Sequence, residues 1–227
     1  MKDKYVLCDA SSLISFTSSC LDEMLKFFHT SFDVKFFIPQ SVEYETVTHP
    51  LSLKTKIHCF SALRIQRMIN DGILEVVSEN LEKETERLMT LGNNVFYARG
   101  RPLVLFHKGE TEMLALAHQL QIDSLLMDER TTRILVEDPE SLRGHLQTEF
   151  KTNILINRKH LSQFISRLGH LDVIRSTELI YLAYKNGFFS KYGKIEREAA
   201  EAALYKLKYS GCAISFKELE KYGELME

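Results

Sequence analysis

Carboxylates stand at the ends of short apolar runs in this 227-residue chain. Asp9 follows the apolar run 5–8, and Asp128 follows the run 125–127. Continuously apolar runs of this length predict strands of a parallel sheet that is covered on both faces. Ligands of open parallel sheets bind beyond the carboxyl ends of the strands, so Asp9 and Asp128 are candidate site residues. An Asp that precedes a helix also caps it, and capping is the competing interpretation of Asp9.

Glu110 opens a predicted helix. Leu114, Ala117 and Leu120 recur at helical spacing after it, and Glu110 lies on the same stripe. Glu112 lies roughly 200° away around the helix axis. The pattern therefore predicts that Glu110 points inward at the edge of the core and that Glu112 points elsewhere.

The stretch 109–133, GETEMLALAHQLQIDSLLMDERTTR, resembles the PIN nuclease family, which consists of PIN-like ribonucleases of the VapC-toxin-like superfamily. In that family a Gly-Glu-x-Glu helix precedes a strand that ends in an acidic pair, followed by an Arg-rich helix start. The run Val6-Leu7-Cys8-Asp9 and the segment 38–45, IPQSVEYE, resemble the first two segments of the family. Met127 departs from the pattern, because many members carry Thr or Ser there.

The resemblance implies an α/β fold, PIN-like and Rossmann-like, with three layers: a central parallel sheet flanked by helices, plus a C-terminal helical extension. It implies that Asp9, Glu110 and Asp128 hold Mg²⁺ or Mn²⁺, and that Glu45 helps directly or through water. Glu129 is the rival of Asp128 as a ligand, because the family often has an acidic pair there. The residues expected to contact the phosphates of single-stranded RNA are Ser11 or Ser12, Arg130 and Arg133.

The chemistry of these residues agrees with a metal site. Clustered carboxylates repel each other, and such a pocket favours a cation. Oxygen ligands without Cys or His suit Mg²⁺ or Mn²⁺. A metal ion can acidify water and neutralise charge on a phosphodiester. The sequence has no Ser-His-Asp triad order and no Gly-rich phosphate loop, so neither a covalent nucleophile nor binding of a nucleoside triphosphate is expected.

The expected division of the chain is a nuclease core over residues 1–136, an insertion over 137–175 and a C-terminal helical segment over 176–227 that packs on the core. A helix is expected through Val42 to Val47, with Ser41 as its cap and with Val42 and Glu45 on one face. A long helix is expected over 53–71, and the residues along one side of it are Ile57, Phe60, Leu63 or Arg64, Arg67 and Met68. Arg99, Arg101 and Lys108 form either a phosphate-facing rim or an ordinary solvated loop.

Composition limits the partners. The net charge is −2, so any binding of nucleic acid must come from a local basic patch. The four cysteines lack C-x-x-C spacing, so zinc and a disulfide framework are not expected. No targeting segment or membrane span is evident, and a cytoplasmic protein is expected.

The expected function is a metal-dependent endoribonuclease that cleaves single-stranded RNA. The alternative is a catalytically inactive PIN-like domain that binds RNA or protein. The RNA target, a toxin role as opposed to a processing role, a protein inhibitor or antitoxin as partner, and a homodimer all stay open at this point.

Overall fold

The computed structural model describes residues 4–212 and 214–226, which form two compact units. The first unit comprises the described residues of 1–77, 125–128 and 174–227, and the second comprises Ser78–Ser124 and Glu129–Val173. Each unit is described by itself. The units are defined in space, whereas the expected segments follow the chain, so the division at residues 136 and 175 stays a prediction.

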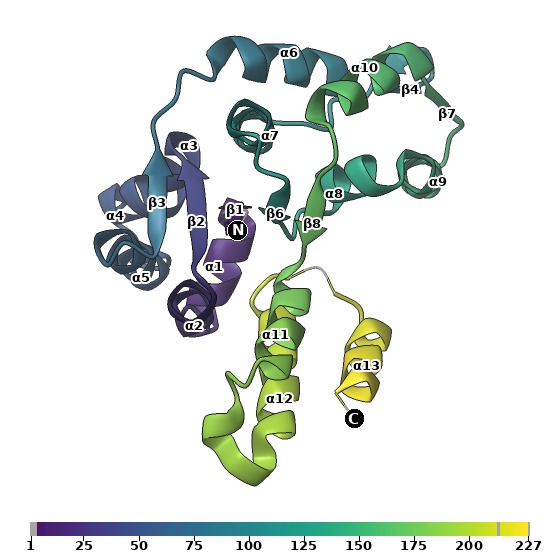
Figure 1. Cartoon of the computed structure of the whole chain (residues 1–227). Coiled ribbons are helices and arrows are strands. Elements are labelled where there is room, and N and C mark those ends of the chain that lie inside the picture. Colours follow the sequence, from purple (N-terminus) through teal and green to yellow (C-terminus); the bar gives the residue numbers. More distant parts are fainter. Residues whose placement is uncertain (1–3, 213, 227) are drawn as a thin grey trace. The chain divides into compact units, whose positions relative to one another are not determined.

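Most elements of the first unit come from the N-terminal third and from the C-terminal end of the chain (Figure 1). They are β1 (Lys4–Cys8), α1 (Ala10–Ser18), α2 (Glu23–Phe32), β2 (Val34–Pro39), α3 (Gln40–Glu43), the π-helix η1 (Tyr44–Thr48), α4 (His49–Ser52), α5 (Cys59–Asn70), β3 (Leu74–Val77), α11 (Ser176–Lys185), the 3-10 helix η2 (Ser190–Ile195), α12 (Glu196–Tyr209) and α13 (Phe216–Leu225).

The second unit is mainly helical. It contains α6 (Glu82–Gly92), β4 (Phe96–Ala98), β5 (Arg101–Pro102), α7 (Lys108–Leu120), α8 (Arg130–Glu137), α9 (Pro139–Phe150), β7 (Ile154–Ile156) and α10 (Arg158–Leu168). Two more strands, β6 (Ser124–Leu126) and β8 (Asp172–Ile174), cross the boundary between the units.

Five strands of the described chain form the central parallel sheet in the order β3-β2-β1-β6-β8. In the parallel pairs, Val6 lies opposite Phe36, and Phe36 lies opposite Leu74. Successive residues of β1, Leu7 and Cys8, are both fully buried, so both faces of this strand are covered. The α/β architecture with a central parallel sheet flanked by helices confirms that part of the expected fold.

Helix α11 completes the core of the first unit. Its residues Leu179, Ile180 and Ala183 are buried in the same apolar cluster as Cys8 and Leu126. Residues that are distant in sequence thus meet around the ends of β1 and β6.

Two helix predictions are wrong. Ser41 does not cap a helix, because α3 has Pro39 as its N-cap and continues into η1. The expected helix 53–71 begins only at Cys59. On its expected face, Ile57 and Phe60 are exposed and Met68 is buried. Helix α5 also buries Ala62 and Ile65, which the expected face did not include.

The basic stretch 99–102 contains a tight turn. Arg99 and Gly100 have φ values of 52° and 76° and join the antiparallel strands β4 and β5. Two central residues with positive φ are typical of the two-residue hairpin turn that matches strand twist. Glycine meets this demand without strain at position 100, and Arg99 meets it at some cost.

Gly92 lets two aromatic rings of the second unit approach α6. A Cβ atom at this position would lie 2.8 Å from Phe106 Cδ2 and 3.2 Å from Phe164 Cε2. The rings of Phe106 and Phe164 pack against each other at 5.5 Å. Gly144 in α9, by contrast, has no heavy atom within 4 Å of such a Cβ.

We predict opposite stability changes for these two glycines. Gly92→Ala should lower the free energy of unfolding by about 1–3 kcal/mol, because it overpacks the site. Gly144→Ala should raise it by about 0.5–1 kcal/mol, because it removes chain entropy from the unfolded state within an open helical position. Urea unfolding of both variants measures the difference, and two changes of the same sign would contradict the described packing.

Candidate functional site

Asp9 ends β1 and caps α1. Its side chain is 7% exposed. One carboxylate oxygen, Oδ1, accepts the backbone N–H of Ser12 at 2.8 Å, and the other, Oδ2, accepts the hydroxyl of Ser11 at 2.5 Å. The capping interpretation of Asp9 is therefore correct as a structural role. It leaves each oxygen with further acceptor capacity, because a carboxylate offers about four lone-pair positions.

Asp128 follows the neighbouring strand β6. The backbone N–H of Asp9 donates to the carbonyl of Leu126 at 3.0 Å, and the N–H of Met127 donates to the carbonyl of Ile174 at 2.9 Å. Asp128 is 8% exposed, and its Oδ1 accepts the backbone N–H of Ser176 at 2.9 Å. Its Oδ2 is buried and accepts no N–H or O–H group, and the thiol of Cys212, a weak donor, interacts with the same carboxylate. Such an atom is costly unless something else binds it.

The two carboxylates are electrostatically coupled. Burial raises the pKa of Asp9 from 3.8 to about 6, the hydrogen bonds from Ser11 and Ser12 oppose this, and the charge of Asp128 raises the pKa further. Burial also raises the pKa of the Cys212 thiol to about 12, with Asp128 as the next cause. The structure thus brings Asp9 and Asp128 together, with a neutral thiol as their neighbour.

Buried hydroxyls accompany the pair. Ser12 and Ser176 lie in the first turns of α1 and α11, and the Oγ atom of each is buried without a hydrogen-bond partner. Ser12 was among the expected phosphate contacts, whereas Ser176 and Cys212 were not. Both missed residues come from the C-terminal part of the chain, far from Asp9 and Asp128 in sequence.

Glu45 lies in η1, which packs against α1 and α5. Its side chain is exposed, although Val42 three residues earlier is buried. The expectation that Glu45 and Val42 share a face assumes α-helical turns. The π-helical turn is wider, so it changes the direction of the residues after Glu43.

Within the second unit, Glu110 and Glu112 differ in their partners, although their burial is similar. Both lie in the first turns of α7 and are half-buried. Glu112 pairs with Lys108 at 3.5 Å. Glu110 Oε2 is buried without a hydrogen-bond partner, so Glu110 keeps a free ligand atom.

Glu129 is engaged by its own helix. Its two carboxylate oxygens accept the backbone N–H groups of Thr131 and Thr132 at 2.8 and 2.6 Å, which caps α8. Arg133 pairs with Glu137 at 3.0 Å, and Arg130 is exposed. The geometry therefore favours Asp128 over Glu129 as the residue with a free oxygen.

The pair Asp9–Asp128 fits a divalent cation that keeps part of its water shell. Mg²⁺ is usually bound through one or two carboxylates plus waters and substrate phosphates. The unpartnered Asp128 Oδ2 supplies a ligand atom of the required type. Within neither unit do three Asp, Glu, His or Cys side chains of the described residues gather as ligands of one ion, so the donors do not form a closed protein cage.

Comparison with known proteins finds no matching family model, no similar curated protein and no similar solved structure. No helix in the described part of the chain is long and apolar enough to cross a membrane.

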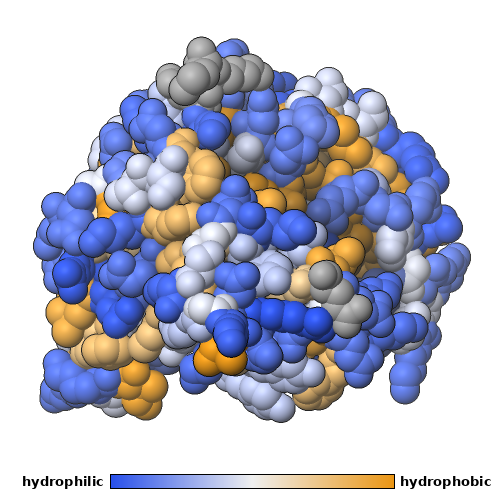
Figure 2. All heavy atoms as spheres, turned by 60° about the horizontal axis from the view of Figure 1, so that its bottom comes forward, coloured by the Kyte–Doolittle hydropathy of each residue, from blue (hydrophilic) through white to orange (hydrophobic). Residues whose placement is uncertain are grey.

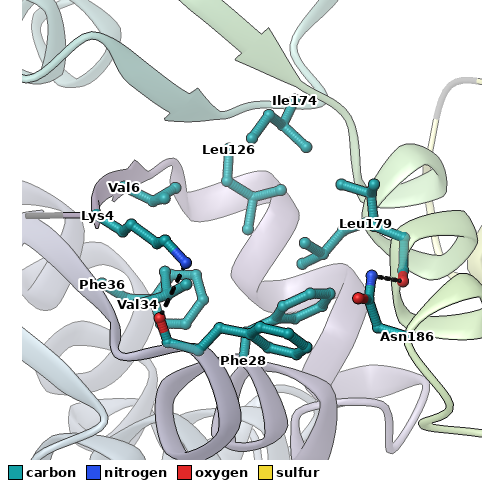
Figure 3. A pocket seen from close by; sticks show the side chains of 11 residues that line it. Lys4, Val6, Phe28, Val34, Phe36, Leu126, Ile174, Leu179 and Asn186 are labelled. Carbon is teal, nitrogen blue, oxygen red and sulfur yellow. Dashed lines mark hydrogen bonds between the residues drawn. The ribbon is translucent and has the colours of Figure 1, made fainter. Parts of the chain in front are cut away.

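A separate apolar cavity of about 240 Å³ lies within the first unit (Figure 3). Phe28, Phe36, Leu126 and Leu179 are among its lining residues. Its two polar groups already have partners: Lys4 Nζ donates to the carbonyl of Phe32 at 3.3 Å, and Asn186 Nδ2 donates to the carbonyl of Leu182 at 2.7 Å. The cavity thus offers packing space and no free group for chemistry.

The face of the molecule in Figure 2 shows apolar side chains scattered among hydrophilic ones. Exposed apolar residues scattered in this way are normal on soluble folds and do not by themselves define an interface. The homodimer and the protein inhibitor, which the sequence leaves open, therefore stay open.

The raised pKa of Asp9 predicts a pH-dependent stability. Between pH 3.8 and about 6 the folded chain holds a proton that the unfolded chain has lost, so the free energy of unfolding falls as the pH rises through this window. Above pH 6 the decrease in the free energy of unfolding is complete, and it amounts to at most roughly 3 kcal/mol. Asp9→Asn keeps an acceptor for Ser12 and removes this loss.

We therefore expect Asp9→Asn to be about 1–3 kcal/mol more stable than the wild type at pH 8 and nearly equal to it at pH 4. Urea unfolding across this range measures the effect. Asp138→Asn is the matched control, because Asp138 caps α9 at the surface through Ser141 N–H at 3.1 Å. A less stable Asp9→Asn variant at pH 8 would contradict the described burial of the carboxylate.

Proposed function

We propose that the chain is a metal-dependent endoribonuclease of the PIN type, which hydrolyses single-stranded RNA at the Asp9–Asp128 pair. The observation that carries the proposal is a buried, coupled pair of carboxylates in which Asp128 Oδ2 has no partner. The pair stands at the carboxyl ends of adjacent strands, where open parallel sheets bind their ligands. The three-layer PIN-like fold is part of the same proposal.

In this proposal Asp9 and Asp128 hold Mg²⁺ or Mn²⁺. The chemistry that such an ion supplies when bound is acidification of water and neutralisation of charge on the scissile phosphate. The chain adds two buried hydroxyls beside the pair, those of Ser12 and Ser176, whose backbone N–H groups donate to Asp9 and Asp128. Ser11 holds Asp9 in place through its hydroxyl.

The ionisation of Asp9 sets a lower pH limit for metal binding at the pair. Its pKa of about 6 means that the carboxylate is mostly ionised only above that pH. Two anions that repel each other and are buried bind a cation more strongly than separate surface carboxylates, because the cation removes both penalties. Metal binding and activity are therefore expected to weaken together as the pH falls below 6.

Other residues enter the proposal through the resemblance. Glu110 is the third proposed ligand, and its unpartnered Oε2 supports that role. Glu45, Arg130 and Arg133 are proposed to assist binding of metal or phosphate, and a toxin-like ribonuclease would have a protein inhibitor or antitoxin as partner.

One observation favours the alternative, an inactive domain that binds RNA or protein. Asp9 and Asp128 both accept N–H groups at helix N-termini, so each has a structural role even without metal. The alternative predicts a stable fold that responds to no divalent cation.

Metal binding separates the two functions. We expect saturating Mn²⁺ to raise the melting temperature of the wild type by roughly 5–10 °C, which corresponds to about 2.7 kcal/mol at a hundredfold excess over the dissociation constant. Asp128→Asn keeps an acceptor for Ser176 N–H but should lose this shift and at least about a hundredfold of the cleavage rate.

Differential scanning fluorimetry and cleavage of a single-stranded RNA measure the two effects, with Asp138→Asn as the control variant. If Mn²⁺ shifts the wild type and Asp128→Asn equally, the pair does not bind the ion.

The face of α7 gives a second test. Glu110→Gln should remove metal-dependent cleavage, because an amide is a poor substitute for an anionic oxygen ligand. Glu112→Gln removes the ion pair with the exposed Lys108 and should leave most of the activity, with a stability change of about 1 kcal/mol. Cleavage of single-stranded RNA in Mn²⁺ by both variants decides the matter. Equal losses, or the larger loss at Glu112, would exclude Glu110 as the ligand.

A further inference from the structure

The second unit carries a polar depression of about 570 Å³ among α6, α7 and α10. This volume is within the range of pockets that bind small molecules. Its lining is polar and basic rather than apolar, and it contains none of the acids discussed above. The lining residues are Arg87, Leu91, His118, Ser162, Gln163, Ser166 and Arg167.

Arg167 is held in a fixed orientation by Glu84. The guanidinium donates from Nε to one oxygen of Glu84, and from Nη2 to the other at 2.7 Å. The hydrogen bond from Arg167 holds the pKa of Glu84 below its ordinary value, so Glu84 stays ionised. The Nη1 group of Arg167 has no acceptor in the described part of the chain. Because Glu84 already holds the Arg167 side chain in one orientation, a ligand that binds the other edge of its guanidinium causes little further loss of side-chain entropy.

The other donors of the depression are unused. Within residues 4–212 and 214–226, the side chains of Arg87, Ser162, Gln163 and Ser166 make neither a hydrogen bond nor an ion pair with the protein. His118 Nε2 lies 3.9 Å from Glu84 Oε1. The charges of Arg167 and Arg87 both act on Glu84 and lower its pKa, so two guanidinium groups stand against one carboxylate and leave an excess of positive charge. Several donors around this excess suit an anion with several acceptor oxygens.

We propose that this depression binds a phosphate of a single-stranded RNA backbone, with Arg87 as the principal contact and the free edge of Arg167 as the second. The identity of the polyanion as RNA rests on the proposed function. No Phe, Tyr or Trp side chain is among the lining residues, and the guanidinium groups and hydroxyls are donors that suit phosphate oxygens, so we place the contact on the backbone, where it is independent of sequence. The proposed role of the depression is to add affinity for the strand.

The test is the salt dependence of RNA binding by the full chain in EDTA, where cleavage cannot consume the probe. The probe is a fluorescein-labelled single-stranded oligouridylate, measured by fluorescence anisotropy over a range of KCl. Arg87→Ala should weaken binding about tenfold at low salt. It should also reduce the slope of log K against log salt by about 0.7, the value for one phosphate contact on a single strand.

Arg67→Ala is the matched control. It removes the same charge from an exposed residue of α5 that pairs with Asp71 at 3.5 Å in the first unit. It should change neither affinity nor slope. Ser166→Asp, which adds an anion to the depression, should weaken binding at least as much as Arg87→Ala. Circular dichroism confirms that the variants are folded.

The outcomes separate this inference from the nuclease proposal. If Arg87→Ala binds RNA with the same affinity and slope as the wild type, or if the wild type does not bind the probe, the phosphate site is rejected whatever the cleavage assay gives. If Arg87→Ala shows the expected loss while the wild type does not cleave RNA in Mn²⁺, the phosphate site stands and the nuclease proposal fails.

Discussion

The first unit depends on the burial of two like charges, Asp9 and Asp128, at the ends of adjacent strands. A carboxylate out of water is stable only if hydrogen bonds or a counter-charge replace its hydration. The chain supplies N–H groups from the first turns of α1 and α11, and these turns also carry the partial positive charge of the helix N-termini. These N–H groups replace only part of the lost hydration. The pKa of Asp9 is still raised, and Asp128 Oδ2 accepts no N–H or O–H group.

This incomplete compensation distinguishes the pair from ordinary helix caps in the same chain. Glu129 uses both oxygens to cap α8, and Asp138 caps α9 at the surface. Neither pays a comparable burial penalty, because each is more exposed than Asp9. If Asp9 and Asp128 served only as helix caps, more exposed caps such as Glu129 and Asp138 would be enough. Holding a second buried carboxylate beside Asp9 lowers stability, and residues that do so are candidates for function.

The sequence predicts the pair because the information is local. A short apolar run followed by an acid and a helix start fixes where Asp9 and Asp128 lie, and parallel pairing brings such strand ends to one edge of a sheet. Ser176 and Cys212 could not be predicted in this way, because they are 48 and 84 residues from Asp128 and only the tertiary fold brings them near. The face of α5 was wrong for a related reason: the tertiary fold buries Ala62 and Ile65 instead of the larger Phe60. The π-helical turn that contains Glu45 cannot be predicted from the spacing of apolar residues.

The chemistry and the proposed affinity also have separate physical bases. The Asp9–Asp128 pair is contained in the first unit, whereas the Arg87 and Arg167 guanidinium groups belong to the second. A net charge of −2 gives the chain no general attraction for RNA, and the buried acids repel phosphates in the absence of metal. In the proposed function, an RNA strand therefore gains binding free energy from local cations of the protein. The bidentate pair of Glu84 with Arg167 leaves Arg87 without a hydrogen bond, and the two guanidinium groups together exceed the charge of that carboxylate.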